Sequence, residues 1–271
     1  IGFSDSFAAP FAPPAGQPGS TAIHMDDPAF VGWAADYTDY QTGERLDPAF
    51  QTPEKAVGKA NGTSFDVVSL GEGGSITMVF DPPVENGEGW DFAVFANPFN
   101  DYFLELAYVE VSSNGIDFVR FDNISYTPDP VSTYGSVDAA LVTGLAGKYR
   151  QGYGVPFNLS TLSEKTEVED GRVDLSAIAY IRIKDIIGDG RHTDSRGNPI
   201  YDPFRQEWGA AGFDLDAIGV SNGAPYPEGS IIAEDWEGEW PQPPDTEGEA
   251  GFDTHSGCFI DNLINSVQPL G

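Results

Sequence analysis

The stretch FLELAYVEVSSNGIDFVRF, residues 103–121, carries the strongest signal of local structure in the chain. Apolar and polar residues alternate on both sides of Asn114-Gly115. An Asn-Gly pair between two alternating runs is typical of a tight β-hairpin, because both residues tolerate the positive φ that such a turn requires. The stretch therefore predicts two antiparallel strands joined by a short turn.

Further short runs suited to β-strands lie on both sides of this hairpin. They are rich in Val, Ile, Phe and Tyr, and turn-forming residues separate them. The clearest are FVGWAADYTDY, SFDVVSLG, GGSITMVFDPPV, GWDFAVFANPF, VDLSAIAYIRIKDII and AGFDLDAIGVSN. Helix signals are few, and NPFNDYF and LVTGLAGKY each suggest one turn. This pattern predicts an all-β fold, an antiparallel sandwich or barrel with long loops and extended termini.

The chain has 271 residues, of which 40% are hydrophobic, which is enough for one large β domain or two small ones. Residues 1–28 are rich in Pro, Ala and Gly and predict an N-terminal arm. Residues 29–222 contain the strand patterns and predict the β-sandwich domain. Residues 223–271 form an acidic, loop-rich extension that ends in the apolar segment CFIDNLINSV, and we expect this extension to pack on the same domain.

Charge is the most unusual compositional property. The 43 acidic residues face 13 Lys and Arg, a formal net charge of -30. Self-repulsion on this scale destabilises a compact state unless cations screen or bind it. Nucleic acid and anionic membrane surfaces are therefore poor partners and we expect no nucleic-acid binding, whereas Ca²⁺, which prefers carboxylate and carbonyl oxygens, is favoured. The alternative is an acidic surface that only keeps a secreted protein soluble.

The cysteine count, the apolar runs and the first residue bear on the cellular compartment of the protein. One cysteine, Cys258, excludes an intrachain disulfide and a CxxC zinc site. The longest apolar runs are shorter than 18 residues, so we expect no membrane insertion. The chain begins at Ile1, which suggests a removed signal peptide, or else a trimmed expression product. We expect a secreted protein of the extracellular space or cell surface.

Four segments together resemble a known family. They are SLGEGGSITMVFDPPVENGEGWDFAVFAN, ELAYVEVSSNGIDF, GLAGKYRQGYGVPFNL and YIRIKDIIGDG with the following GNPIYDP and GFDLDAIGV. Their succession over about Val31 to Asn222 resembles bacterial secreted cell-surface proteins related to PEP-CTERM-anchored proteins. The resemblance implies a jelly-roll β-sandwich with a discoidin-like pattern, similar also to carbohydrate-binding modules. The chain departs from anchored members because it lacks a C-terminal apolar helix with a basic end.

The stretch DIIGDGRHTDSRGNPIYDP, residues 185–203, predicts a metal-binding loop. Acids and amides that are separated by glycine can fold around a Ca²⁺ ion, which needs six to eight oxygens. The alternative is a series of Asx turns, in which Asp and Asn bond to their own backbone. The candidate ligands here are Asp185, Asp189, Asp194, Asn198 and Asp202.

Two further groups of residues extend this prediction. Asp214 and Asp216 are two apart in a strand and so point to one face, while Phe213 and Leu215 point to the other. Two adjacent carboxylates either flank a cation or face solvent at the end of a strand. A second cation site is predicted from residues near the hairpin: Asp91, Asn97 and Glu105.

Catalysis is not expected. Glycosidases need two carboxylates on either side of a sugar, and 43 acids will place some pair at that distance by chance. The sequence contains no nucleophile elbow, HExxH or P-loop. It names no carboxylate for a glycan hydrolase, which is the third and least favoured function.

The favoured function is a non-enzymatic, calcium-stabilised extracellular protein with a structural or adhesive role. Copies could form a homo-polymer, as filaments or layers, by exchanging the N-terminal arm or a strand of the C-terminal segment, with Phe3, Phe7 and Phe11 as anchors. The alternative is a module that captures a glycan or another small molecule. Its candidate contact residues are Trp33, Trp90, Trp208 and Trp236.

Overall fold

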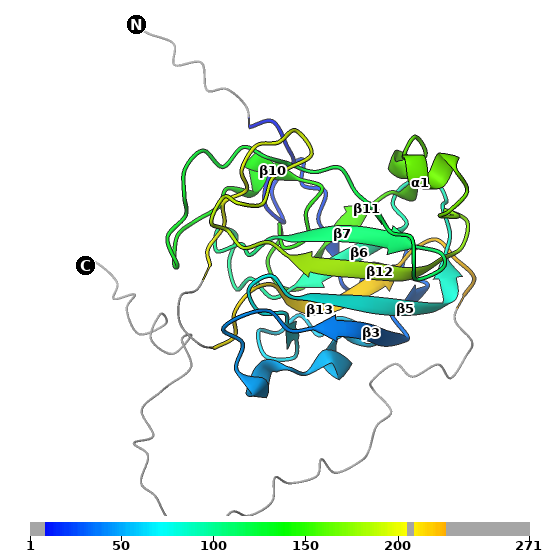
Figure 1. Ribbon diagram of the computed structural model, residues 1–271, viewed down its shortest axis with the longest axis horizontal. Coiled ribbons are helices and arrows are strands. Elements are labelled where there is room, and N and C mark those ends of the chain that lie inside the picture. Colours follow the sequence, from blue (N-terminus) through cyan, green and yellow to red (C-terminus); the bar gives the residue numbers. More distant parts are fainter. Residues whose placement is uncertain (1–8, 205–208, 226–271) are drawn as a thin grey trace, which may run out of the picture. The chain divides into compact units, whose positions relative to one another are not determined.

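The computed structural model describes residues 9–204 and 209–225. Two antiparallel sheets pack face to face as a β-sandwich, which confirms the predicted all-β class. The five-stranded sheet forms one layer, and β7, β12, β5 and β3 run side by side across it in Figure 1. Its strand order is β3 (Asp36–Gln41), β5 (Ser75–Val84), β12 (Ile178–Asp185), β7 (Ala107–Ser112) and β8 (Val119–Arg120).

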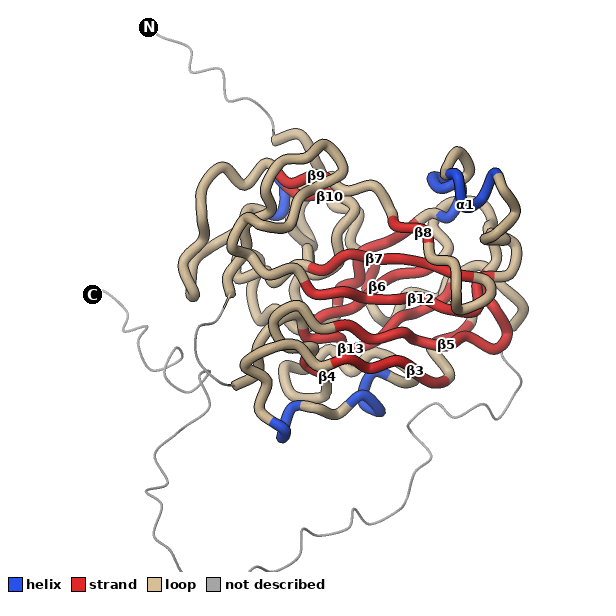
Figure 2. The backbone as a smooth tube through the Cα atoms, in the orientation of Figure 1, coloured by secondary structure: helices blue, strands red, loops and turns tan. Residues whose placement is uncertain are grey.

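The other layer is a six-stranded sheet in which β6 and β13 are central. Its order is β1 (Ile23–His24), β11 (Tyr153–Phe157), β6 (Phe92–Ala96), β13 (Asp214–Val220) and β2 (Gly32–Trp33), and β4 (Val68–Ser69) also pairs with β13. A separate two-stranded sheet joins β9 (Ile124–Ser125) to β10 (Val142–Thr143). Figure 2 shows this pair among the long loops beyond one end of the sandwich.

Helical segments are short. The 3₁₀ turns span Pro48–Phe50, Pro53–Ala56, Ala139–Leu141 and Leu159–Leu162, and α1 spans Thr166–Glu169. None of the helices in the described ranges is long and apolar enough to cross a membrane.

The main core lies between the two sheets. It follows the two-residue period of the strands, since Ile181 and Ile183 of β12 face Val94 of β6 and Ile218 of β13 in one buried cluster. Full burial of each such side chain contributes about 1.5–3 kcal/mol. Both β6 and β13 are buried along their whole length, so their outer face must also be covered.

Aromatic side chains supply that cover, and they form a group that we call the outer aromatic cluster: Phe30, Trp33, Trp90 and Phe95. The Phe30 ring lies 4.8 Å from Trp33 and 5.2 Å from Trp90, measured between ring centroids. Small residues of the sheet make room for these rings, because a Cβ atom on Gly219 would lie 2.5 Å from the Phe30 ring. The outer face of the sheet therefore carries a small core of its own.

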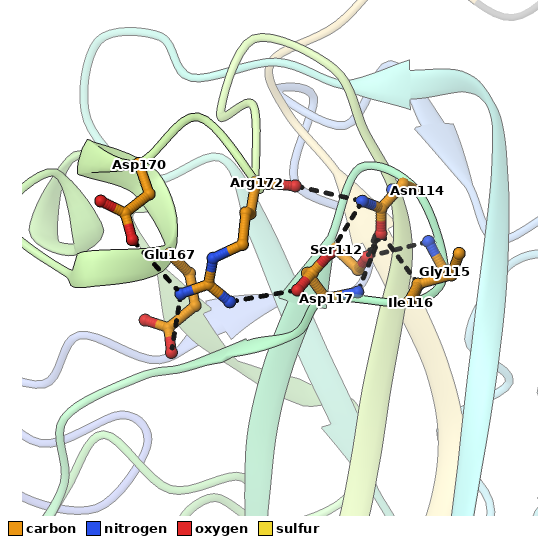
Figure 3. Close-up of polar contacts among 8 residues, drawn as sticks. All are labelled: Ser112, Asn114, Gly115, Ile116, Asp117, Glu167, Asp170 and Arg172. Atoms are coloured by element: carbon orange, nitrogen blue, oxygen red, sulfur yellow. Dashed lines mark hydrogen bonds and ion pairs between the residues drawn. The ribbon is translucent and has the colours of Figure 1, made fainter.

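The predicted hairpin is confirmed. Strands β7 and β8 pair antiparallel, with Glu110 opposite Arg120. At the turn, the Asn114 side-chain oxygen accepts from the N–H groups of Ile116 and Asp117 (Figure 3). Asn114 also donates to the carbonyl of Arg172, whose guanidinium donates to Asp117, so the turn is tied to the segment that follows α1.

The two predicted helical turns are wrong. In residues 97–103 the Asn100 side chain accepts from the N–H groups of Tyr102 and Phe103, and this local bonding forms a turn in place of a helix. The segment LVTGLAGKY begins in the last residue of a 3₁₀ turn and continues as β10, where Val142 pairs with Ser125.

The described part of the N-terminal arm lies against the sandwich. The Phe11 ring stacks on Tyr126 at 5.6 Å, and the Phe11 N–H donates to the carbonyl of Ala140. Ala15 is buried in the main core, and β1 pairs with β11 at the edge of the six-stranded sheet. Phe3 and Phe7 lie outside the described residues.

A substitution at Gly115 tests the hairpin of residues 103–121. Gly115 has φ +73°, and a Cβ there would lie 3.3 Å from the Tyr180 ring. We expect Gly115→Ala to lower the free energy of unfolding by about 1–2 kcal/mol, because the left-handed backbone is costly for alanine. Urea denaturation measures this. Gly171→Ala, at φ +71° with open space around it, isolates the backbone cost. An unchanged midpoint for Gly115→Ala would contradict this account of the turn.

Candidate functional site

The predicted metal ligands are mostly buried aspartates, and the structure shows what their carboxylates contact. Six of them, Asp91, Asp185, Asp189, Asp194, Asp202 and Asp216, accept hydrogen bonds from backbone N–H groups, in several cases from segments that are far away in the sequence. The number of lone pairs that these bonds leave on each carboxylate, out of about four, decides what else the carboxylate can bind.

Asp185 ends β12 and joins the two sheets. Its two oxygens accept from the N–H groups of Gly73, in the turn before β5, and Phe213, just before β13, both at 2.7 Å. Burial raises the pKa of Asp185 to about 8; the negative charges of Glu72 and Asp214 add to this effect, and the two N–H groups oppose it. These two bonds leave one lone pair on each oxygen of the carboxylate.

Asp202 is the most isolated of the carboxylates. One oxygen, Oδ2, accepts from the N–H of Leu106 at 2.6 Å, while Oδ1 is buried and has no hydrogen-bond partner. Burial raises the pKa of Asp202 well above its usual value, and the negative charges of Asp185 and Glu72 raise it further. A buried acceptor without a donor costs about 1–3 kcal/mol.

Glu72 was not predicted as a site residue. It lies in the Gly71–Gly74 turn between β4 and β5, is buried, and its charge acts on both Asp185 and Asp202. The sequence offered a weak signal, since an acid between glycines in GEGG is also typical of an exposed turn. We call Glu72, Asp185 and Asp202 the acid cluster.

Asp214 and Asp216 point to the same face of β13, as predicted, while Phe213 and Leu215 lie in the main core. Asp216 accepts from the N–H groups of Asn61 and Gly62. Asp214 accepts from Ser69 Oγ and from Asn97, whose amide also donates to the Ser64 carbonyl. Both carboxylates therefore hold the loop of residues 61–66.

The predicted second cation site is divided between two places. Asn97 contacts Asp214, whereas Asp91 is buried elsewhere and accepts from Gly87 N–H, Leu159 N–H and the Asn222 amide. Glu105 is half-buried just before β7. The structure therefore brings Asn97 together with Asp214, which the sequence had placed in a different group.

The rest of the predicted loop is closed by local bonds. Asp194 accepts from the N–H groups of Arg196, Asn198 and Ser125 and from the Asn198 amide, so all four lone-pair positions are used. Burial alone would raise the pKa of Asp194, but these bonds bring it below its usual value. Asp189 is paired with Arg191. These residues follow the Asx-turn alternative.

In residues 9–204 and 209–225, no group of three or more His, Cys, Asp or Glu side chains could hold a metal ion as the side chains stand. Where carboxyl groups do gather, they are buried, and burial together with the neighbouring acids raises the pKa of Asp185 and Asp202. Trp33 and Trp90 lie together in the outer aromatic cluster, half-buried. Trp208 and Trp236 fall outside the described residues.

Asp216 predicts a measurable pH dependence. Burial raises the pKa of Asp216 to about 6, so between pH about 4 and 6 the folded state holds its proton more tightly than the unfolded chain does. The stability that Asp216 contributes is therefore full at low pH and is lost as the pH rises through this window. Asp216→Asn should flatten that decline in urea denaturation series.

Asp216→Asn should also destabilise the fold at pH 7 by about 1–3 kcal/mol, because an amide nitrogen cannot accept one of the two backbone N–H bonds. Asp129→Asn, at an exposed aspartate, controls for the loss of one negative charge. If the free energy of unfolding of Asp216→Asn changes with pH in parallel with that of the parent protein, the pH dependence does not come from Asp216.

The sequence matches no protein-family model, and it matches no curated protein. The resemblance to PEP-CTERM-related surface proteins therefore stays a prediction.

Proposed function

We propose that this protein is a non-enzymatic, calcium-stabilised extracellular protein with a structural or adhesive role at the cell surface. The observation that supports this proposal is the use of its buried acids. Asp91, Asp185, Asp194 and Asp216 each accept two or more backbone N–H groups and so fix loops to strands. Such carboxylates serve the scaffold, whereas a glycosidase needs its acids beside a bound sugar.

Calcium is part of the proposal because of charge. A net charge of -30 works against compaction, and the acid cluster adds negative charge inside the fold. A hard divalent cation that binds only the folded state stabilises it by mass action, by about 2.7 kcal/mol at a free concentration of 100 times Kd.

Assembly is proposed through exchange of the N-terminal arm. Its described part already binds the body through the Phe11–Tyr126 stack and the β1–β11 pairing. Because both halves of these contacts belong to one chain, a second copy offers the same acceptor surface, which is the condition for an arm-exchanged polymer.

Chelation tests the calcium proposal. We expect millimolar Ca²⁺ to raise the melting temperature of the purified protein and EDTA to lower it, because the ion binds the folded state alone. Differential scanning calorimetry measures the shift, and NaCl at matched ionic strength controls for screening. If EDTA leaves both the melting temperature and the assembly state unchanged, the calcium proposal fails.

The second candidate function is capture of a glycan, and the outer aromatic cluster favours it. Trp33 and Trp90 flank Phe30 on the outer face of the six-stranded sheet, and both residues are half-buried. Aromatic rings with one apolar face and a polar edge are suited to stacking on sugar rings. In this case a strict monomer would show saturable binding.

A glycan array followed by calorimetry tests this second function. If a glycan binds, Trp33→Ala and Trp90→Ala should each weaken it by about 2- to 10-fold, since one aromatic contact contributes about 0.5–1.5 kcal/mol. Tyr134→Ala removes an exposed aromatic ring outside the cluster and should change nothing. Equal losses in all three variants would place the glycan elsewhere.

A further inference from the structure

One side-chain oxygen in the acid cluster is unexplained by the fold. Asp202 is 1% exposed, and its Oδ1 is buried without a hydrogen-bond donor. The charged groups that act on Asp202 do not compensate this unpaired oxygen. They are Asp185 and Glu72, and both are acids. An unpaired acceptor among buried carboxylates is the environment in which a cation replaces the absent donors.

The oxygens of Asp202 face the loop that follows Asp185. A Cβ atom placed on Gly188 would lie 2.0 Å from Asp202 Oδ1 and 2.1 Å from the Asp202 carbonyl oxygen. Two oxygens of Asp202 thus pack against the backbone of Gly188, which lies three residues after Asp185. The glycine allows this approach, since any side chain would displace both oxygens.

Asp185 can contribute to the same site. It is 2% exposed, and each of its oxygens accepts one backbone N–H, which leaves one lone pair on each oxygen. Glu72, 3% exposed, adds a third buried carboxylate from the Gly71–Gly74 turn. Three carboxylates with backbone carbonyls and water satisfy the six to eight oxygens that Ca²⁺ takes.

We propose that Asp202, Asp185 and Glu72 form the calcium site of this protein, and that Asp189, Asp194 and Asn198 are not ligands. The inference rests on the proposed calcium function and names its residues. Asp194 has no lone pair left, and Asp189 already has Arg191 as its cation. As they stand, no three such side chains among the described residues could hold a metal ion, so the proposal requires that ion binding draw the three carboxylates together around the loop at Gly188.

The site has a structural consequence. Its residues come from the Gly71–Gly74 turn, the end of β12 and the loop at Asp202, and Asp202 is bonded in turn to Leu106 just before β7. An ion held there ties together segments that lead into both sheets. The calcium therefore stabilises the loop-rich end of the sandwich.

Calcium titration of two variants tests the assignment. Asp202→Asn preserves size and the bond from Leu106, but places an amide at the site in place of one carboxylate oxygen. We expect it to raise the Kd for Ca²⁺ in isothermal titration calorimetry by at least about tenfold and to abolish the calcium-dependent rise in melting temperature. The matched control, Asp189→Asn, should bind Ca²⁺ as the parent protein does.

The outcomes separate the two proposals. If the parent protein neither binds Ca²⁺ nor is stabilised by it, the proposed calcium function fails. If the parent binds and Asp202→Asn binds equally well, or Asp189→Asn loses binding, only the site assignment is overturned. Crystals grown with Ca²⁺ decide the matter even if Asp202→Asn does not fold. An anomalous peak between Asp202 and Asp185 supports the site, and a peak only at Asp189 or Asp194 overturns it.

Discussion

The fold depends on buried aspartate carboxylates that accept backbone N–H groups from distant segments. Asp185 joins the end of β12 in one sheet to the residue before β13 in the other, and Asp91 joins the entry of β6 to the segment after β11. Each bond satisfies a donor in a loop that belongs to no sheet ladder. Where the acceptor carboxylate is ionised, such a bond is stronger than a neutral one, so a few carboxylates can order long loops.

A local irregularity in β13 also helps a buried aspartate to bond the N–H groups of a distant loop. The register of β13 against β6 shifts between Leu215 and Ala217. This shift leaves Leu215 and Ile218 in the main core, while Ala217 joins the cluster on the outer face. A bulge re-aims side chains in this way without ending the strand. Asp216 therefore reaches the N–H groups of Asn61 and Gly62, although the strand around it is buried on both faces.

Sequence alone predicted the features with local causes. The hairpin around Asn114-Gly115 is one, because alternating strands and turn residues are local signals; the connection is longer than a two-residue turn, since β7 ends at Ser112 and β8 begins at Val119. The shared face of Asp214 and Asp216 is another, because it follows from the two-residue period of a strand. Strand β11 was missed because Gly154 and Pro156 are poor strand residues. Pro156 pairs with Ala93 on one side, and β1 pairs only with Tyr153 and Gly154 on the other.

The composition of the acid cluster could not be predicted, because it is a product of long-range packing. The sequence grouped Asp185 with Asp189 and Asp194 by proximity along the chain, whereas the fold places Glu72, over 100 residues earlier, in electrostatic contact with it. Asp194 has the same sequence signal as Asp202, yet four donors saturate one and a single N–H reaches the other. The count of donors around each carboxylate distinguishes a turn residue from a candidate ligand.

The number of hydrogen-bond donors and cations around each carboxylate also explains how so acidic a chain can bury these groups. The charge of Glu110 is compensated by Arg120 and Arg182. Asp194 instead accepts four hydrogen bonds from N–H groups. Asp185 and Asp202 have fewer donors and negative neighbours, which leaves a proton or a cation. A proton neutralises one carboxylate and weakens it as an acceptor for Gly73 and Phe213. In the proposed calcium site, a divalent cation would compensate two carboxylates at once and leave both ionised, so that the bonds that join the sheets would keep their charge-assisted strength.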